Sequence, residues 1–288
     1  MQNQFLRAAV RSLYDIQKMR IQSGNRIVAA FRTKLGIAPS ESEKDDDDAA
    51  KLLESLRTEY KRMTNGVVKV TKKFECDSPL ITNTSELYLL QAYDHQCKTE
   101  DIHTKAIKNL LEAEPIWNEW LGQVRGIGPL MGGVLLSEID IHKAQYPSSL
   151  WKLAGLDVAP NAEGVMEGRS KRSYHLVPKT YTNRDGEITE TVGITFNPFL
   201  KTKMVGVLAD VFIKVKGKYR NIYDDYKNRL ENHEVWKDRT KAHRHNAAKR
   251  YMVKRFLADL HAEWRRIEGL PVALEYHEAK LGHKHGQK

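Results

Sequence analysis

A glycine-flanked turn in the middle of the chain carries residue types suited to binding a phosphate group. Residues 124–133 read VRGIGPLMGG. Gly126 can adopt a positive φ and so end one helix, while Ile127 can fold back as an apolar plug. Gly128 leaves the next helix N-terminus free of side chains, and Pro129 suits its first turn. Because free N–H groups at a helix N-terminus bind anionic oxygen, the spacing predicts a phosphate site.

The surrounding residues favour DNA as the source of that phosphate. The upstream stretch IWNEWLGQV is apolar on one helical face, and a helix of small residues follows the turn. This pattern resembles the helix-hairpin-helix signature of DNA repair, replication and recombination proteins, which grip phosphates without reading bases. The predicted DNA contacts at the turn are Arg125, Gly126, Ile127 and Gly128. The alternative is a plain helix–helix turn, in which Gly132 and Gly133 only permit close packing.

The charge of the chain is concentrated in its second half. Residues 1–140 carry 19 Lys and Arg against 20 Asp and Glu, whereas residues 141–288 carry 28 against 17. A cationic surface favours polyanion binding because each neutralised phosphate releases condensed counterions. The same asymmetry also occurs in proteins without nucleic-acid partners.

The first part of the chain is expected to be helical. The apolar pattern predicts helices over 4–35 and 84–113, with Asn83 or Thr84 opening the second. Between them it predicts a helix that includes residues 49–64 and that Ser40 or Ser42 could cap. Four aspartates, residues 45–48, fit the first turn of a helix better than a metal cluster. The first helix has a mainly apolar face marked by Phe5, Val10, Leu13, Ile16, Met19 and Ile27.

The second part is predicted to combine helices with one β-hairpin. Residues 174–196 hold β-branched residues on both sides of Arg184-Asp185-Gly186, a suitable hairpin turn. Asn197 and Pro198 then form an N-cap pair for a helix. Its predicted buried side is Leu200, Met204, Leu208 and Val211. The last helix places Met252, Phe256, Leu260 and Trp264 at steps of four. The expected fold class is therefore mainly α, a helical protein with a helix-hairpin-helix element and one inserted β-hairpin.

Roughly residues 115–268 resemble a known family. The run GIGPLMGGVLLSEI, then SLWKLAGL, then a Gly-rich basic loop, is similar to the C-terminal domain of the insertion-sequence 110/116/902 transposases. The stretches NPFLKTKMVGVLADVFIK and HNAAKRYMVKRFLADLHAEW resemble the two closing helices of that domain. The resemblance implies a DNA recombinase with an N-terminal RNase-H-like domain holding four acidic metal ligands, and a nucleophilic serine in the C-terminal domain.

The sequence departs from the family in both catalytic features. Residues 1–110 lack the early Gly-Ile-Asp strand that would carry the first ligand, and Ala162-Glu163-Gly164 stands near the expected serine-glycine pair. Ser170 and Ser173 in the loop EGRSKRSYH are the candidate nucleophiles that the resemblance leaves. A serine that attacks a phosphodiester needs deprotonation and a cationic cradle.

Cations from two segments could supply that cradle or bind DNA without chemistry. His175 could act as a base for the serine. The predicted DNA contacts beyond the turn are Arg169, Lys171, Arg172, Lys249, Arg250 and Lys254. A basic loop that binds phosphate without any reaction is the simpler interpretation of GRSKRS.

The sequence indicates no certain cofactor. The histidines lack the spacing of a zinc site, so no metal site is predicted, although strand cleavage would require Mg²⁺. Cys76 and Cys97 are too few for a disulfide framework and favour a cytoplasmic protein with reduced thiols. There is no apolar run of about 18 residues, so no membrane span is expected.

Three segments and one main partner follow from these patterns. Residues 1–110 form a helical region that could mediate homodimerisation, residues 111–270 the transposase-like DNA-binding domain, and residues 271–288 a basic, His-containing tail. DNA is the predicted partner; the sequence leaves a guide RNA undecided. The predicted function is DNA binding in transposition or recombination, with a non-catalytic architectural or assembly protein as the alternative.

Overall fold

The chain folds into two compact units. The computed structural model describes residues 4–37, 44–64, 78–161, 163–165 and 172–273. Unit 1 comprises residues 1–7 and 108–288, and unit 2 comprises residues 8–107. The described residues are mainly helical and include one two-stranded antiparallel sheet, which confirms the expected class. The helix-hairpin-helix element stays a prediction, and most of the expected C-terminal tail lies outside the described residues.

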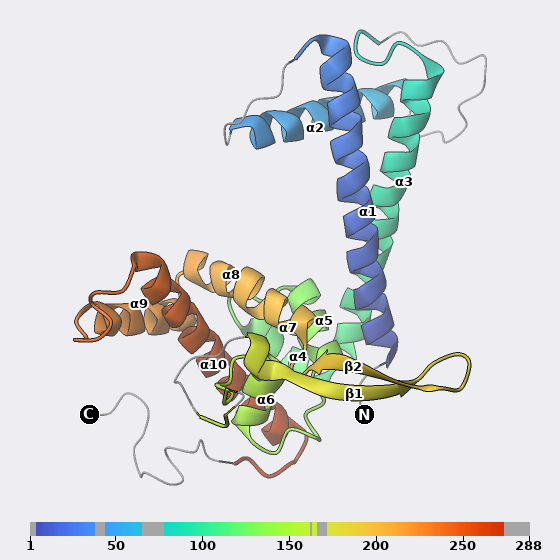
Figure 1. The fold of residues 1–288 in the computed structure, drawn as a ribbon. Helices are drawn as coiled ribbons and strands as arrows, with labels where there is room; N and C mark the ends of the chain where they lie inside the picture. The colour runs from blue at the N-terminus through green and yellow to red at the C-terminus, as the bar shows by residue number, and fades with distance from the viewer. Residues whose placement is uncertain (1–3, 38–43, 65–77, 162, 166–171, 274–288) are drawn as a thin grey trace. The chain divides into compact units, whose positions relative to one another are not determined.

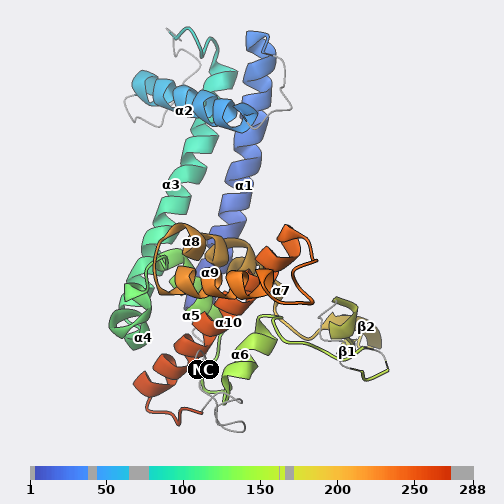
Figure 2. The same ribbon diagram turned by 90° about the vertical axis from the view of Figure 1, so that its left-hand side faces the viewer.

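Unit 2 is built from three helices. These are α1 (Gln4–Leu35), whose first residues belong to unit 1, α2 (Lys44–Thr64) and α3 (Thr84–Glu112). Figures 1 and 2 show α1 and α3 side by side, with α2 across them at one end. Asn83 caps α3, because its Oδ1 accepts from the Glu86 N–H at 2.9 Å while the Glu86 carboxylate accepts from Thr82 N.

The buried face of α1 differs in part from the expected one. Val10 and Leu13 are buried, but Phe5 is 81% exposed and Met19 53% exposed, so neither belongs to the core. Leu6 is fully buried instead. Leu6, Val10 and Leu13 follow the i, i+4, i+7 spacing of one helical face, from which the neighbouring Phe5 points away.

Unit 1 is organised around its last helix. The long helix α10 (Lys241–Ile267) packs against α9 (Lys218–Glu231), α6 (Pro147–Leu153), α4 (Pro115–Glu119) and α8 (Ala209–Lys214). The predicted four-residue spacing is confirmed: Met252, Phe256, Leu260 and Trp264 are all buried. The remaining helix before the β-hairpin is α5 (Pro129–Glu138).

The predicted β-hairpin is confirmed, and it projects from the helices of unit 1. Strand β1 (Leu176–Thr182) pairs with β2 (Ile188–Ile194) in an antiparallel register that joins Leu176 to Ile194 and Thr182 to Ile188. Asn183 Oδ1 accepts from the N–H groups of Asp185 and Glu187, and Gly186 has φ +83°. The side chain of Asn183 and the left-handed glycine therefore fix the turn.

A π-helical segment connects two α-helical pieces after the hairpin. The helix starts as α7 (Pro198–Lys201), widens over Thr202–Leu208 and continues as α8. Asn197 caps it by accepting from Leu200 N at 3.1 Å, as predicted. The predicted core residues Leu200, Met204 and Leu208 are fully buried, while Val211 is half-buried. Four-residue steps overshoot an α turn, and the wider π turns compensate for this drift.

Helix α9 lies in a segment whose secondary structure the sequence left unassigned. Its sequence, KYRNIYDDYKNRLE, is polar apart from three tyrosines, one isoleucine and one leucine. Tyr219, Tyr223 and Leu230 are buried, and α9 packs against α10 and α8, so tertiary packing decides its helical state. None of the helices described here is long and apolar enough to cross a membrane.

Candidate nucleic-acid interface

The turn at residues 124–128 has the backbone conformation that its glycines predict. Gly126 has φ +99°, and the Ile127 N–H donates to the Val124 carbonyl at 3.0 Å. A Cβ added at Gly126 would lie 3.0 Å from Val215 Cγ2, so the loop packs tightly on the end of α8. Ile127 is only 7% exposed and forms the expected plug. The turn is therefore held in place by the core.

Gly128 differs from the other glycines of this segment because it faces open space. It is exposed, its φ is −96°, and an added Cβ would meet nothing within 4 Å. Gly128 is the N-cap of α5 and has no side chain to cap it, and Pro129 at the first helical position has no N–H. The next N–H groups in the first turn of α5 have no partner within the helix, because an α-helix leaves its first N–H groups unpaired. These N–H groups lie at the positive end of the helix dipole and can bind an anionic oxygen.

Gly132 supports the packing alternative for its own position. A Cβ at Gly132 would lie 2.8 Å from Cε3 of Trp117 and closer still to Cζ3. Gly122 contacts the other part of the same indole, because its added Cβ would be 3.2 Å from Cε2. Gly132 is therefore required by the Trp117 ring, whereas no packing contact requires a glycine at position 128.

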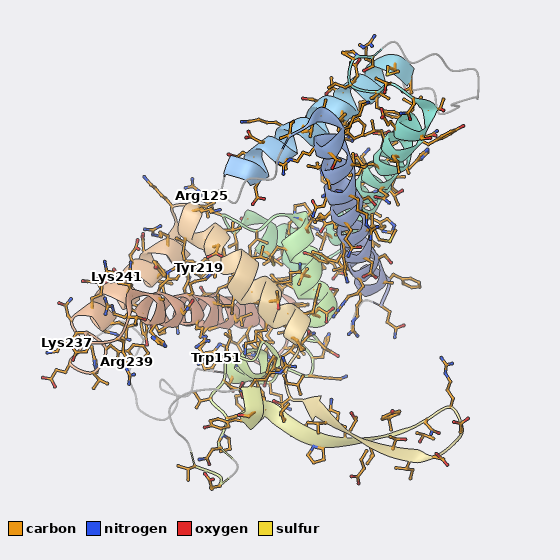
Figure 3. All side chains as sticks on the ribbon, turned by 45° about the horizontal axis from the view of Figure 1, so that its top comes forward. Arg125, Trp151, Tyr219, Lys237, Arg239 and Lys241 are labelled. Atoms are coloured by element: carbon orange, nitrogen blue, oxygen red, sulfur yellow. The ribbon has the colours of Figure 1, made fainter. Side chains whose placement is uncertain are left out.

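Arg125 extends the cationic character of the turn. It is exposed and forms no hydrogen bond or ion pair with the described part of the chain. Its stem approaches Gly217 at the start of α9, since a Cβ added at Gly217 would lie 3.8 Å from Arg125 Cδ. Figure 3 labels Arg125 beside the end of α8. Since no described side chain occupies its guanidinium, Arg125 can bind a phosphate.

A second group of cations surrounds Trp151, where α6 meets α10. Helix α6 ends at Leu153, and Gly155, with φ +60°, turns the chain so that the Leu156 N–H donates back to the Trp151 carbonyl at 2.8 Å. Trp151 Nε1 donates to the Lys254 carbonyl at 3.0 Å. We call Trp151, Asp157, Lys201, Arg250 and Lys254 the Trp151 cluster.

The charges of the Trp151 cluster are poorly compensated. Burial lowers the pKa values of the Lys201 and Lys254 ammonium groups, and the charge of Arg250 lowers them further against the attraction of Asp157. Lys254 Nζ lies 5.3 Å from the Trp151 ring centroid. Asp157 Oδ1 is buried and has no hydrogen-bond partner among the described residues. Because three cations face one carboxylate, the cluster can bind an additional anion.

The structure removes Lys249 from the set of free cations. Its side chain is 10% exposed and its Nζ lies 2.6 Å from Asp210 Oδ1. Lys249 precedes Met252, Val253 and Phe256 by three, four and seven residues, so it shares their buried face of α10. The adjacent Arg250 points to solvent. The proposed interface therefore omits Lys249.

The predicted basic loop falls largely outside the described residues. Arg169, Ser170 and Lys171 all lie there. Arg172 and Ser173 belong to a short 3-10 turn before β1 and are exposed. His175 is only 1% exposed, and its Nδ1 lies 3.0 Å from Thr195 Oγ1. Its buried ring is poorly placed to accept a proton from a serine at the surface.

Sequence reasoning missed a third group of cations between α9 and α10. Lys237, Arg239 and Lys241 are exposed, and Figure 3 shows them together at this connection, apart from Trp151 and Arg125. The Arg244 guanidinium fixes the loop by donating to the carbonyls of Lys237, at 2.8 Å, and Arg239. The run WKDRTK carried this signal, but its charges alternate, which is typical of a solvated loop.

The predicted residues therefore form two separate sites, the turn at 124–128 and the Trp151 cluster. Figure 3 shows Arg125 and Trp151 at different places on unit 1. Among the described residues, no group of three or more His, Cys, Asp or Glu side chains could hold a metal ion. No family model, curated protein or solved structure matches this chain.

Proposed function

We propose that this protein binds DNA through the sugar–phosphate backbone and acts in DNA transposition or recombination. The observation that carries the proposal is the open Gly128 at the start of α5, next to Arg125, which no described residue binds through a hydrogen bond or ion pair. One phosphate would accept hydrogen bonds from the N–H groups at the start of α5 and would also bind the guanidinium of Arg125. These contacts bind a strand in any sequence, so they position DNA and do not select a target.

The Trp151 cluster supports the proposal by offering a second contact to the same polymer. Arg250 is exposed, and Asp157 is the described carboxylate that attracts both half-buried ammonium groups, Lys201 and Lys254, so these three cations lack full charge compensation. A bound phosphate would supply it. Two separated cationic sites fit an extended polyanion better than a small anion. The net positive charge of residues 141–288 acts in the same direction.

Fluorescence anisotropy with a labelled DNA duplex between 50 and 200 mM salt tests the proposal. Replacing Gly128 by leucine covers the start of α5 without backbone strain, because its φ is negative. Loss of one hydrogen bond to a charged group is worth about 1.5–3 kcal/mol, which raises Kd roughly 10- to 150-fold. Gly206→Leu is the matched control, because Gly206 is exposed and an added Cβ there comes only within 4.0 Å of Thr202.

Arg125 gives an independent readout of phosphate contact. Arg125→Gln should reduce the slope of log Kobs against log salt by about 0.9, the value for one phosphate. Lys143→Gln removes the same charge from a side chain that is 87% exposed and should leave the slope unchanged. The proposal is refuted if the wild-type protein shows no salt-dependent DNA binding, or if Gly128→Leu binds as the Gly206→Leu control does.

Strand chemistry is a separate part of the proposal. Ser170 and Ser173 are the candidate nucleophiles, and magnesium is the metal that such a reaction would require. If one of them attacks DNA, its alanine variant should lose covalent attachment to labelled DNA while it retains binding. If both variants cleave as the wild type does, neither serine is the nucleophile.

A non-catalytic architectural protein is the second candidate function. Two observations favour it: Ala162 stands near the position where the resembled family has serine, and His175 is buried. This candidate expects DNA binding with the same dependence on Gly128. It expects no cleavage of duplex or branched DNA when magnesium is added.

A further inference from the structure

A small pocket opens beside the turn that carries Arg125. Its volume is about 180 Å³. Trp120 and Val124 line it from the segment that leads into the turn. Phe212, Val215 and Tyr219 line it from the region where α8 meets α9. Since a water molecule in the liquid takes about 30 Å³, the pocket has room for roughly six waters. That is the scale of a single planar ring system and is below the usual size of a drug-like ligand site.

The walls of this pocket are aromatic and rigid. The rings of Phe212 and Tyr219 are stacked with centroids 4.6 Å apart. Both pack on Phe256, which is fully buried, at 5.3 and 5.4 Å. Trp120 lies parallel to Phe256 at 6.3 Å. The rings are thus fixed by the core of unit 1, and a planar ligand could bind without rearranging it.

The cations of the pocket are not equivalent. Lys218 Nζ and Tyr219 Oη both donate to Asp259 Oδ2, at 2.7 and 2.9 Å. Arg220 Nε donates to Asp224 at 2.6 Å. Arg125 alone among the pocket's three cations has no carboxylate partner in the described part of the chain. The pocket therefore combines an apolar aromatic interior with one cation, Arg125, that no carboxylate of the described residues neutralises.

We propose that this pocket binds an unpaired nucleobase of the DNA strand whose phosphate is bound by Arg125 and the start of α5. The inference rests on the proposed function and extends it to the form of DNA that is bound. A base is planar and uncharged, so it fits the aromatic interior, and the backbone attached to it supplies the anion for Arg125. A paired base is stacked inside the duplex and cannot enter, so the site selects an overhang or a bulge.

Duplexes that differ only in one unpaired nucleotide test the inference. One has a single unpaired nucleotide, placed as an end overhang or as a bulge, and its partner has an abasic nucleotide at the same position. The two have the same phosphates, so their difference in Kd reports the base alone. Base stacking on aromatic side chains strengthens binding about 5- to 150-fold per base. We expect the wild-type protein to prefer the duplex with the base by a factor in this range.

Filling the pocket should abolish that preference. Val124→Phe places a ring in the pocket and should bind both duplexes as the wild type binds the abasic one. Val207→Phe is the control, because Val207 is 41% exposed and does not line the pocket. Trp120→Leu removes a wall instead of filling the space, and it should reduce the preference even if Val124→Phe does not fold. Far-UV circular dichroism verifies folding of each variant.

The outcomes separate this inference from the proposed function. If the wild type binds both duplexes equally, or if folded Val124→Phe retains the preference, the inference is refuted while backbone binding stands. If the wild type binds no DNA, both fall. A preference that is lost in Val124→Phe and kept in Val207→Phe supports the pocket as the base site.

Discussion

The contact between Gly132 and Trp117 gives the sharpest test of how the candidate interface is held. Gly132→Ala places a methyl carbon 2.8 Å from Cε3 of the indole, and nearer to Cζ3, where carbon atoms normally stay about 3.5–4.0 Å apart. The indole cannot swing freely away, because Gly122 packs against it as well. Either the ring or α5 must move by roughly an ångström.

Overpacking costs about 1–3 kcal/mol, and a contact too short by roughly an ångström belongs to the upper part of that range, about 2–3 kcal/mol. Because Gly132 is inside α5, the alanine also gains about 0.8–1 kcal/mol of helix propensity. The net effect is destabilising as long as the ring is present. Thermal unfolding followed by circular dichroism at 222 nm should show a Tm lowered by roughly 2–8 °C, at about 2–4 °C per kcal/mol for a domain of this size.

Removing the ring should reverse the sign of the effect. In a Trp117→Leu background the alanine meets no indole, so Gly132→Ala should raise Tm relative to Trp117→Leu alone. The double-mutant cycle isolates this coupling from the cost of losing Trp117. If Gly132→Ala is neutral in the wild type, or has the same sign in both backgrounds, the packing account of Gly132 is wrong.

Three further predictions concern other parts of unit 1. Lys249→Met should leave the Kd for DNA unchanged in anisotropy, whereas Arg250→Gln should weaken binding, because the Lys249 ammonium is already bound by Asp210. Asn197→Ala should lower the free energy of unfolding by about 2–4 kcal/mol in urea titration, since it removes both the cap of α7 and the hydrogen bond of 2.6 Å to the buried Glu138. Burial lowers the pKa of His261 below its ordinary value near 6.5, so the unfolded chain binds a proton more readily. Stability should therefore fall as the pH drops below about 6.5 toward the lowered pKa of the folded state, and His261→Gln should make that decline shallower in urea titrations at each pH.

Local patterns in the sequence predicted much of the secondary structure. The apolar spacing of Met252 to Trp264 placed the buried face of α10. Asn197 was predicted as the cap of its helix, and Asn83 was one of two candidates for the cap of α3. The β-hairpin followed from one glycine-containing turn. These features depend on neighbours within a few residues along the chain, which is why a single sequence is enough to find them.

Tertiary structure decided which residues of the candidate interface are available. Lys249 and Arg250 are adjacent and carry the same charge, but only Arg250 is exposed. Lys249 lies on the buried face of α10, and its ammonium group binds Asp210. The pocket joins Trp120 and Val124 to Tyr219, which no local pattern relates. Likewise, α9 forms where its tyrosines pack on the core. The sequence by itself determined the long helices with a clear apolar face and the glycine turn, whereas burial and long-range packing determined α9 and which side chains face solvent or each other.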